Sequence, residues 1–168
     1  MCIELGIDMN ENKNRYPHDF KLWHDIRIDE YATEKALKAK KEHEELFKQF
    51  AAIANKYLPL QKSNAGYTII IATSPAELIK EGEILHHCVG RMGYDQKMLR
   101  EESLIFFVRK KSEIEKPFVT MEYSLKTKSI LQCYAYHNTK PSDDILHFVN
   151  KQWLPYANRQ IKKITAAA

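Results

Sequence analysis

The sequence predicts an α+β protein: a long N-terminal helix, then a small, mostly antiparallel sheet of about four strands with helices packed on one face. Three observations lead to this fold class. An apolar stripe of helical period precedes residue 60, four short segments rich in β-branched and aromatic residues follow it, and Ser-Pro and Pro-Ser-Asp sequences open further helices. We divide the 168 residues into a helical extension at 1–62 and an α+β core domain at 63–165.

The composition is that of a chain that folds. Apolar residues make up 44% of it and charged residues 29%, which is enough to fill a core and unlike a disordered tail. Its three cysteines, Cys2, Cys88 and Cys133, are widely spaced without a CxxC pair, and this suits a reducing compartment. No run of about 18 apolar residues is present, and the N-terminal segment is acidic where a secretion signal is basic and then apolar. We therefore expect a soluble, cytoplasmic protein without a membrane association.

The charge is uneven along the chain. The net charge is +4, and residues 61–168 hold 16 Lys and Arg against 11 Asp and Glu. A basic excess favours an anionic partner through counterion release. Many proteins without a nucleic-acid role carry as much, so charge alone leaves a nucleic-acid partner open.

The first long element is a helix from Asp25 to Leu58. Its apolar residues recur at i, i+4, i+7 and i+11, and Pro59 ends it. This stripe is formed by Leu46, Phe50, Ile53 and Tyr57. The first half of the helix, Thr33–Glu45, is rich in Ala, Lys and Glu and has little apolar area, so we expect it to project into solvent or to contact a protein partner.

A strand and a helix follow this first element. Tyr67–Ala72 is β-branched and apolar, which is typical of a buried strand. Ser74 then caps a helix, with Pro75 at its first position and Glu77 placed for a capping box. We expect Gly82 to break or bend this helix, and we expect another helical turn or two from Tyr94.

Three further strands are predicted as an antiparallel meander, at Leu104–Arg109, Pro117–Tyr123 and Ile130–Tyr136, with a turn at Lys126–Lys128. A helix opened by Pro141 and Ser142 completes the domain.

The second strand of the meander carries polar side chains among apolar ones. Phe118, Thr120 and Glu122 share one face of it. A three-residue turn would set Glu122 opposite Gln132 and Thr120 opposite Tyr134. This register predicts a polar patch on the sheet; the alternative is the ordinary solvent-facing side of a meander.

The segment His86-His87-Cys88 concentrates chemically active side chains. One imidazole could act as a general acid or base near neutral pH, with Glu122 or Asn138 orienting it or holding a substrate. We expect Cys88 to be a buried small hydrophobe rather than a nucleophile. A zinc site would need more ligands at suitable spacing, so we predict no metal ligands.

Other signatures of chemistry are absent from the sequence. There is no Gly-rich phosphate loop, GxSxG elbow, HExxH helix or EF-hand loop, and five glycines are too few for a dinucleotide fingerprint. We predict no cofactor and leave a divalent metal open.

An ordered series of motifs resembles the PcfJ-like family, which is named after a protein of a conjugative plasmid and is spread through mobile genetic elements and prophages of Gram-positive bacteria. The motifs are Leu85–Gly90, Tyr94, Ile105–Arg109, Pro117–Glu122 and Ile130–Gln132 ending at Asn138. The resemblance covers almost the whole chain. It implies that the chain is the C-terminal domain of a longer member or a truncated one, and it implies no particular reaction. Tyr134 and Ala135 depart from the basic residue and glycine that are common in the family.

These observations together predict an accessory protein of mobile genetic elements that acts on or beside nucleic acid, as a binding module with a polar pocket. One alternative is a hydrolase or transferase acting on a phosphodiester or nucleotide with a His general acid or base. The other is a protein-binding inhibitor or adaptor that uses the long helix. The candidate catalytic residues are His86, His87 and Glu122, and the candidate substrate-binding residues are Tyr94, Arg109, Thr120, Gln132 and Asn138.

Overall fold

The structure is a computed structural model that describes residues 1–166. It divides into two compact units, Met1–Leu46 and the remainder from Phe47 onward. The first unit contains α1 (Asn12–Arg15) and the first part of the long helix α2 (Phe20–Tyr57). The units divide within α2, whereas the sequence-based division falls after residue 62. The reason is that Phe50, Ala54 and Tyr57 at the end of α2 are buried in the core of the second unit.

The long helix confirms the main expectation from its apolar stripe. It ends at Tyr57, and Pro59 lies in the 3₁₀ turn Leu58–Leu60 directly after it. Between residues 33 and 45 nearly every side chain is exposed. None of the described helices is long and apolar enough to cross a membrane.

The second unit is built on a five-stranded antiparallel sheet whose strand order follows the chain order. The strands are β1 (Lys62–Ser63), β2 (Tyr67–Ile71), β3 (Ser103–Lys110), β4 (Val119–Ser124) and β5 (Ser129–Tyr134). The four predicted strands are all present. The additional strand, β1, has only two residues, which is too short to show an alternating pattern.

The register of β4 and β5 is the predicted one, although it arises differently. Glu122 pairs with Gln132, and Thr120 pairs with Tyr134. The turn between the strands has four residues rather than three, and Ser124 pairs with Ser129. A bulge at Leu131 adds one residue to β5, because Tyr123 pairs with Ile130 while Glu122 pairs with Gln132. The longer turn and the bulge shift the register by one residue in opposite directions, so Glu122 and Thr120 keep their predicted partners.

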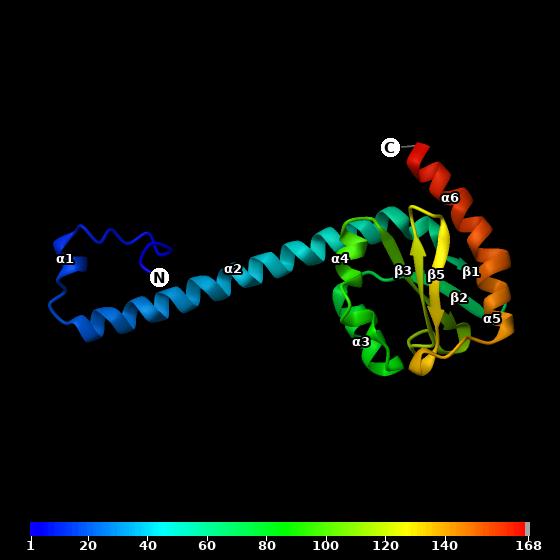
Figure 1. The fold of residues 1–168 in the computed structure, drawn as a ribbon, viewed down its shortest axis with the longest axis horizontal. Helices are drawn as coiled ribbons and strands as arrows, with labels where there is room; N and C mark the ends of the chain where they lie inside the picture. The colour runs from blue at the N-terminus through cyan, green and yellow to red at the C-terminus, as the bar shows by residue number, and fades with distance from the viewer. Residues whose placement is uncertain (167–168) are drawn as a thin grey trace. The chain divides into compact units, whose positions relative to one another are not determined.

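Helices cover both faces of the sheet, so the expectation of helices on one face is wrong. In Figure 1, α3 (Pro75–Leu85) and α4 (Tyr94–Leu99) lie on one side, and α5 (Asp143–His147) and α6 (Leu154–Ala166) lie on the other. The π-helical segment Phe148–Trp153 joins α5 to α6. Burial on both faces explains why β3 is almost entirely apolar, with every side chain from Ser103 to Arg109 buried.

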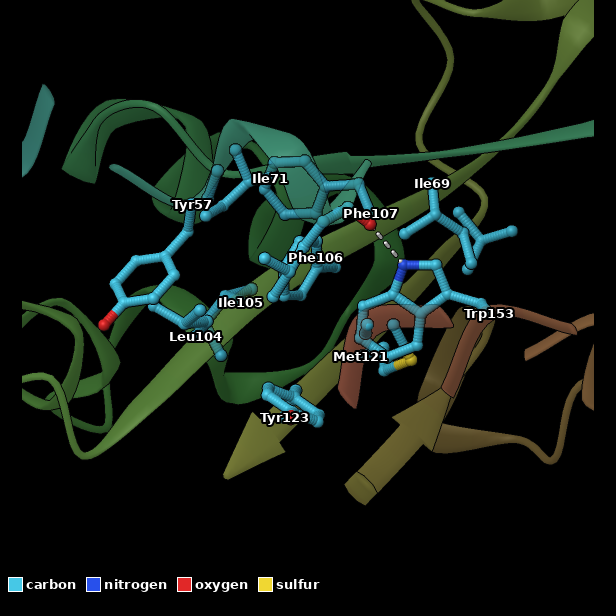
Figure 2. Packing of buried hydrophobic residues seen from close by; sticks show 14 of the residues in the cluster. Tyr57, Ile69, Ile71, Leu104, Ile105, Phe106, Phe107, Met121, Tyr123 and Trp153 are labelled. Carbon is cyan, nitrogen blue, oxygen red and sulfur yellow. Dashed lines mark hydrogen bonds between the residues drawn. The ribbon is translucent and has the colours of Figure 1, made fainter. Parts of the chain in front are cut away.

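Part of the core lies between the sheet and the α5–α6 segment, and Trp153 belongs to it (Figure 2). The indole is fully buried and packs edge-on against Phe106 and Tyr123, at centroid distances of 4.9 and 5.5 Å. Its Nε1 donates a hydrogen bond of 2.8 Å to the Leu60 carbonyl oxygen. This core fixes the back of the sheet and leaves the α3–α4 face to carry the polar residues.

The 3₁₀ turns of residues 1–166 lie at Leu58–Leu60, Cys88–Gly90 (η2), Lys111–Glu113 and Tyr136–Asn138 (η4). Of these, η2 follows α3 and η4 follows β5, so both lie in segments that hold the candidate residues.

Candidate functional site

A pocket lies on the α3–α4 side of β4 and β5. Six of the eight predicted site residues line it: His87, Tyr94, Thr120, Glu122, Gln132 and Asn138. The other lining residues are Cys88, Val89, Ile105 and Tyr134. The pocket therefore gathers side chains from η2, α4, β3, β4, β5 and η4 around one space.

Two close backbone approaches place the segment that carries His87. Contrary to the expectation that Gly82 breaks or bends it, α3 continues to Leu85, and His86 ends it in the left-handed conformation, with φ of 52°. The chain then folds back, and His87 N donates to the Gly82 carbonyl oxygen at 3.1 Å. A Cβ on Gly82 would lie 2.8 Å from the His87 carbonyl oxygen, and one on Gly90 would lie 2.6 Å from Ile79 Cα. Glycine is thus required at both positions because η2 packs directly on α3.

The His87 imidazole belongs to a chain of hydrogen bonds that begins at a buried ion pair. Arg109 donates to both carboxylate oxygens of Glu81, at 2.9 and 2.5 Å. The Thr120 hydroxyl donates to Glu81 at 3.0 Å, and its oxygen lies 3.0 Å from His87 Nε2. Since Thr120 gives its one proton to the carboxylate, it accepts from Nε2–H. In this arrangement the neutral imidazole has its lone pair on Nδ1.

Burial lowers the pKa of His87 below its ordinary value of 6.5, and the charge of Glu81 opposes this effect. The ring is half-buried, and the neutral imidazole is the favoured form at neutral pH. A neutral imidazole with a defined tautomer can accept a proton from a bound group.

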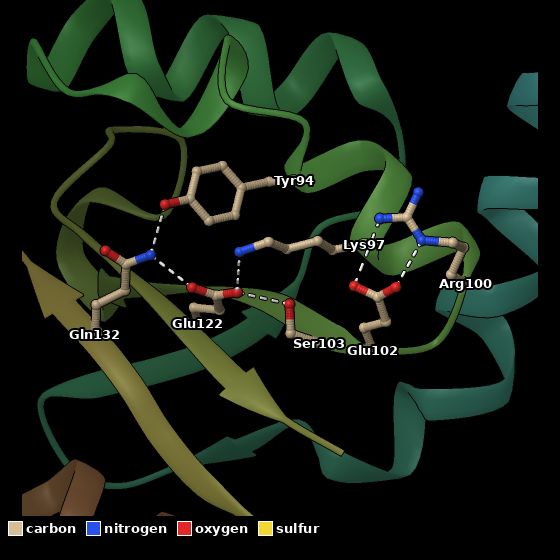
Figure 3. A network of polar contacts seen from close by, with 7 residues as sticks. All are labelled: Tyr94, Lys97, Arg100, Glu102, Ser103, Glu122 and Gln132. Atoms are coloured by element: carbon tan, nitrogen blue, oxygen red, sulfur yellow. Dashed lines mark hydrogen bonds and ion pairs between the residues drawn. The ribbon is translucent and has the colours of Figure 1, made fainter. Parts of the chain in front are cut away.

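Glu122 is the centre of a second polar network, shown in Figure 3. Its carboxylate accepts from Ser103 Oγ at 2.7 Å and from Lys97 Nζ at 3.2 Å through one oxygen. The other oxygen accepts from Gln132 Nε2 at 2.5 Å. Three donors therefore satisfy a side chain that is only 3% exposed. With both oxygens engaged, Glu122 orients its neighbours.

Tyr94 and Gln132 extend this network toward the pocket. Gln132 Nε2 also donates to the Tyr94 hydroxyl at 2.6 Å, so the phenol acts as acceptor there and keeps its own proton for another partner. Asn138 at the pocket mouth is exposed, and within residues 1–166 its side chain makes no hydrogen bond. The phenol and the Asn138 amide are thus placed to bind a polar ligand.

Two predicted residues lie outside the pocket wall. His86 is exposed, and its ring stacks on His137 with centroids 5.0 Å apart. Arg109 is buried behind the pocket in its pair with Glu81. The prediction that Cys88 is buried is wrong, because it is exposed and lines the pocket. The turn of η2 turns this side chain outward.

Sequence reasoning missed Glu81, Lys97 and Ser103, which support the pocket residues from behind. Glu81 lies on the inner face of α3, three residues after Leu78, and this spacing is a signal that could have found it. Ser103 is adjacent to Glu122 only through the β3–β4 pairing, for which no sequence signal exists.

Among residues 1–166, no three His, Cys, Asp or Glu side chains gather in a way that could hold a metal ion.

Comparisons with known proteins place the chain in a family. The PcfJ-like protein family matches residues 1–149. An uncharacterized protein of Listeria innocua serovar 6a is 29% identical over 147 residues, which is 88% of this chain and 30% of that protein. The chain therefore spans less than a third of the length of this curated relative. No solved structure matches the chain. With most of its length matched, the chain belongs to the PcfJ-like protein family.

Proposed function

We propose that this chain is a cytoplasmic accessory protein of mobile genetic elements that acts on or beside nucleic acid and holds the base of a nucleotide in the pocket between His87 and Gln132. The observation that supports this most is the convergence of side chains from six separate elements on one pocket. The setting in conjugative plasmids and prophages is what the family resemblance implies, and it is part of the proposal.

The lining of the pocket fits a flat, polar, heteroaromatic ligand. The rings of Tyr94 and Tyr134 supply aromatic walls. Both N–H groups of Gln132 are engaged by Glu122 and Tyr94, so its carbonyl oxygen supplies an acceptor for a base edge, and the Asn138 amide supplies a donor and an acceptor. The excess of basic over acidic residues after residue 60 favours a polyanion as the larger partner.

A titration with nucleoside monophosphates tests this proposal on the full chain. We expect the NMR signals of the Gln132 and Asn138 side-chain amides to shift in a saturable way. The Gln132→Ala variant should weaken binding, while Leu131→Ala should not, because Leu131 is 54% exposed and is not among the pocket-lining residues. Absence of any shift at millimolar nucleotide, or equal loss in both variants, would contradict the proposal.

The second candidate function is hydrolysis or transfer at a phosphodiester or nucleotide, and the Arg109–Glu81–Thr120–His87 hydrogen-bond chain favours it. The buried ion pair fixes the acceptor for Thr120, and Thr120 fixes the tautomer of His87. In this role His87 is the general base, and Glu122 keeps Gln132 and Lys97 in place around the reacting group.

Incubation with oligonucleotides and nucleotides, with and without Mg²⁺, tests the catalytic role. Turnover should be abolished in His87→Gln and reduced in Thr120→Val, which removes the hydroxyl that orients the imidazole. A product formed at the same rate by His87→Gln would overturn the role of His87. Activity that disappears with EDTA would add a divalent metal to the reaction.

The adaptor function through Thr33–Glu45 stays a prediction. The exposure of nearly every side chain in this segment is compatible with a protein partner. The pocket has the more specific chemistry, and we therefore place the nucleic-acid function first.

A further inference from the structure

Three aromatic rings form an exposed cluster beside the pocket. His86 stacks on His137 with an interplanar angle of 21°, and Tyr136 packs edge-on against both rings, at centroid distances of 5.3 Å from His86 and 4.3 Å from His137. All three residues are exposed, Tyr136 by 51%. We call His86, Tyr136 and His137 the aromatic cluster.

The cluster adjoins the pocket through a shared wall. A second hollow is lined by His86 and Arg91, and it shares His87, Cys88 and Asn138 with the pocket. Tyr136 and His137 directly precede Asn138 in η4. A strand with one base in the pocket would therefore place its next nucleotide over this hollow and against the cluster.

The backbone holds the cluster at a conformational cost. His86, His137 and Asn138 have φ values of 52°, 53° and 57°, in the left-handed region that residues other than glycine rarely adopt. Such a conformation is unfavourable and persists only where the surrounding structure fixes it. The two segments that carry the rings, the end of α3 and η4, are thus both locked in an unusual geometry at the pocket mouth.

We infer that the aromatic cluster stacks an unpaired base next to the nucleotide in the pocket, so that the ligand is single-stranded nucleic acid. This inference rests on the proposed function. Exposed aromatic faces stack on unpaired bases without regard to sequence, whereas the bases of a duplex are already stacked on one another. Arg91, which lines the hollow together with Glu83, supplies a cation for the backbone between the two bases.

The test compares one nucleotide with a strand. Affinities of the full chain for a nucleoside monophosphate, a labelled 10-nucleotide DNA or RNA single strand, and the matching duplex are measured by calorimetry and fluorescence anisotropy. We expect the single strand to bind more tightly than the mononucleotide and the duplex. Tyr136→Ala and His137→Ala should each weaken strand binding by about 5- to 150-fold and leave mononucleotide binding unchanged. Tyr136→Phe should retain strand affinity because the ring remains, and Tyr16→Ala, an exposed tyrosine of the first unit, serves as control.

The outcomes separate this inference from the proposed function. Mononucleotide binding without any gain for the strand, or strand binding that Tyr136→Ala leaves intact, overturns the inference and keeps the proposed function. Duplex bound as tightly as the single strand also overturns it. Absence of both mononucleotide and strand binding overturns both.

Discussion

Gln132 donates to the Glu122 carboxylate across β4 and β5 at 2.5 Å, and this contact joins the base of the pocket to its wall. The same amide nitrogen donates to Tyr94 on α4. One side chain therefore couples the sheet to the helix that closes the pocket.

Replacing Gln132 by Glu should set two carboxylates against each other in a largely buried site. We expect Gln132→Glu to lower the free energy of unfolding at pH 7 by roughly 1–3 kcal/mol. The loss should shrink as the pH falls, because one proton shared by the two carboxyl groups restores the hydrogen bond. Chemical denaturation at several pH values measures this, with Leu131→Glu as the exposed control. A pH-independent loss would contradict the contact.

The Glu81–Arg109 pair should be costly to break. Both residues are buried, so Arg109→Met would leave the Glu81 charge without its partner, and we expect a loss of about 3–5 kcal/mol. The exposed pair of Lys116 with Glu113 is the control, and Lys116→Met should barely change stability. Equal effects of the two substitutions in urea denaturation would show that the Glu81–Arg109 pair is not desolvated.

The packing of η2 on α3 should tolerate no side chain at Gly90. A Cβ there would lie 2.6 Å from Ile79 Cα and 2.9 Å from the Leu78 carbonyl oxygen. We expect Gly90→Ala to cost about 1–3 kcal/mol, whereas Gly66→Ala, with nothing within 4 Å of its Cβ, should change stability by less than about 0.5 kcal/mol. Matching melting temperatures for the two variants would contradict the close approach.

The lowered pKa of His87 predicts the direction in which the stability of the chain changes with pH. Burial lowers this pKa below 6.5 in the folded chain, so the unfolded chain takes up its proton first as the pH falls. The contribution of His87 to the free energy of unfolding is therefore fully present above about pH 7. It is lost as the pH falls from 6.5 toward the pKa of His87 in the folded chain. Wild type should lose more stability than His87→Gln over this range. Parallel pH profiles of the two proteins would show that the imidazole is not desolvated.

How much of the site could be predicted from sequence depends on whether its signals are local. Alternation along β4 and the length of the turn placed Glu122 opposite Gln132, and this pair is confirmed, although the turn is longer and Leu131 forms a bulge. No local pattern could reveal that the two deviations compensate. The helices on the second face were missed for a related reason, since burial of both faces depends on how distant segments pack.

The supporting residues show the same limit at the level of single side chains. The spacing after Leu78 could place Glu81 on the inner face of α3, but neither its contact with Thr120 nor that of Ser103 with Glu122 has a sequence signal, because both are tertiary. The residue type of Cys88 predicts a place in the core, and the turn of η2 exposes it instead.

The central claim is that the pocket between His87 and Gln132 holds the base of a nucleotide. A crystal structure of the full chain with a nucleoside monophosphate tests it most directly. We expect the base to lie between Tyr94 and Tyr134, with its polar edge within hydrogen-bond distance of the Gln132 or Asn138 amide. A nucleotide bound elsewhere on the chain with this pocket empty would contradict it.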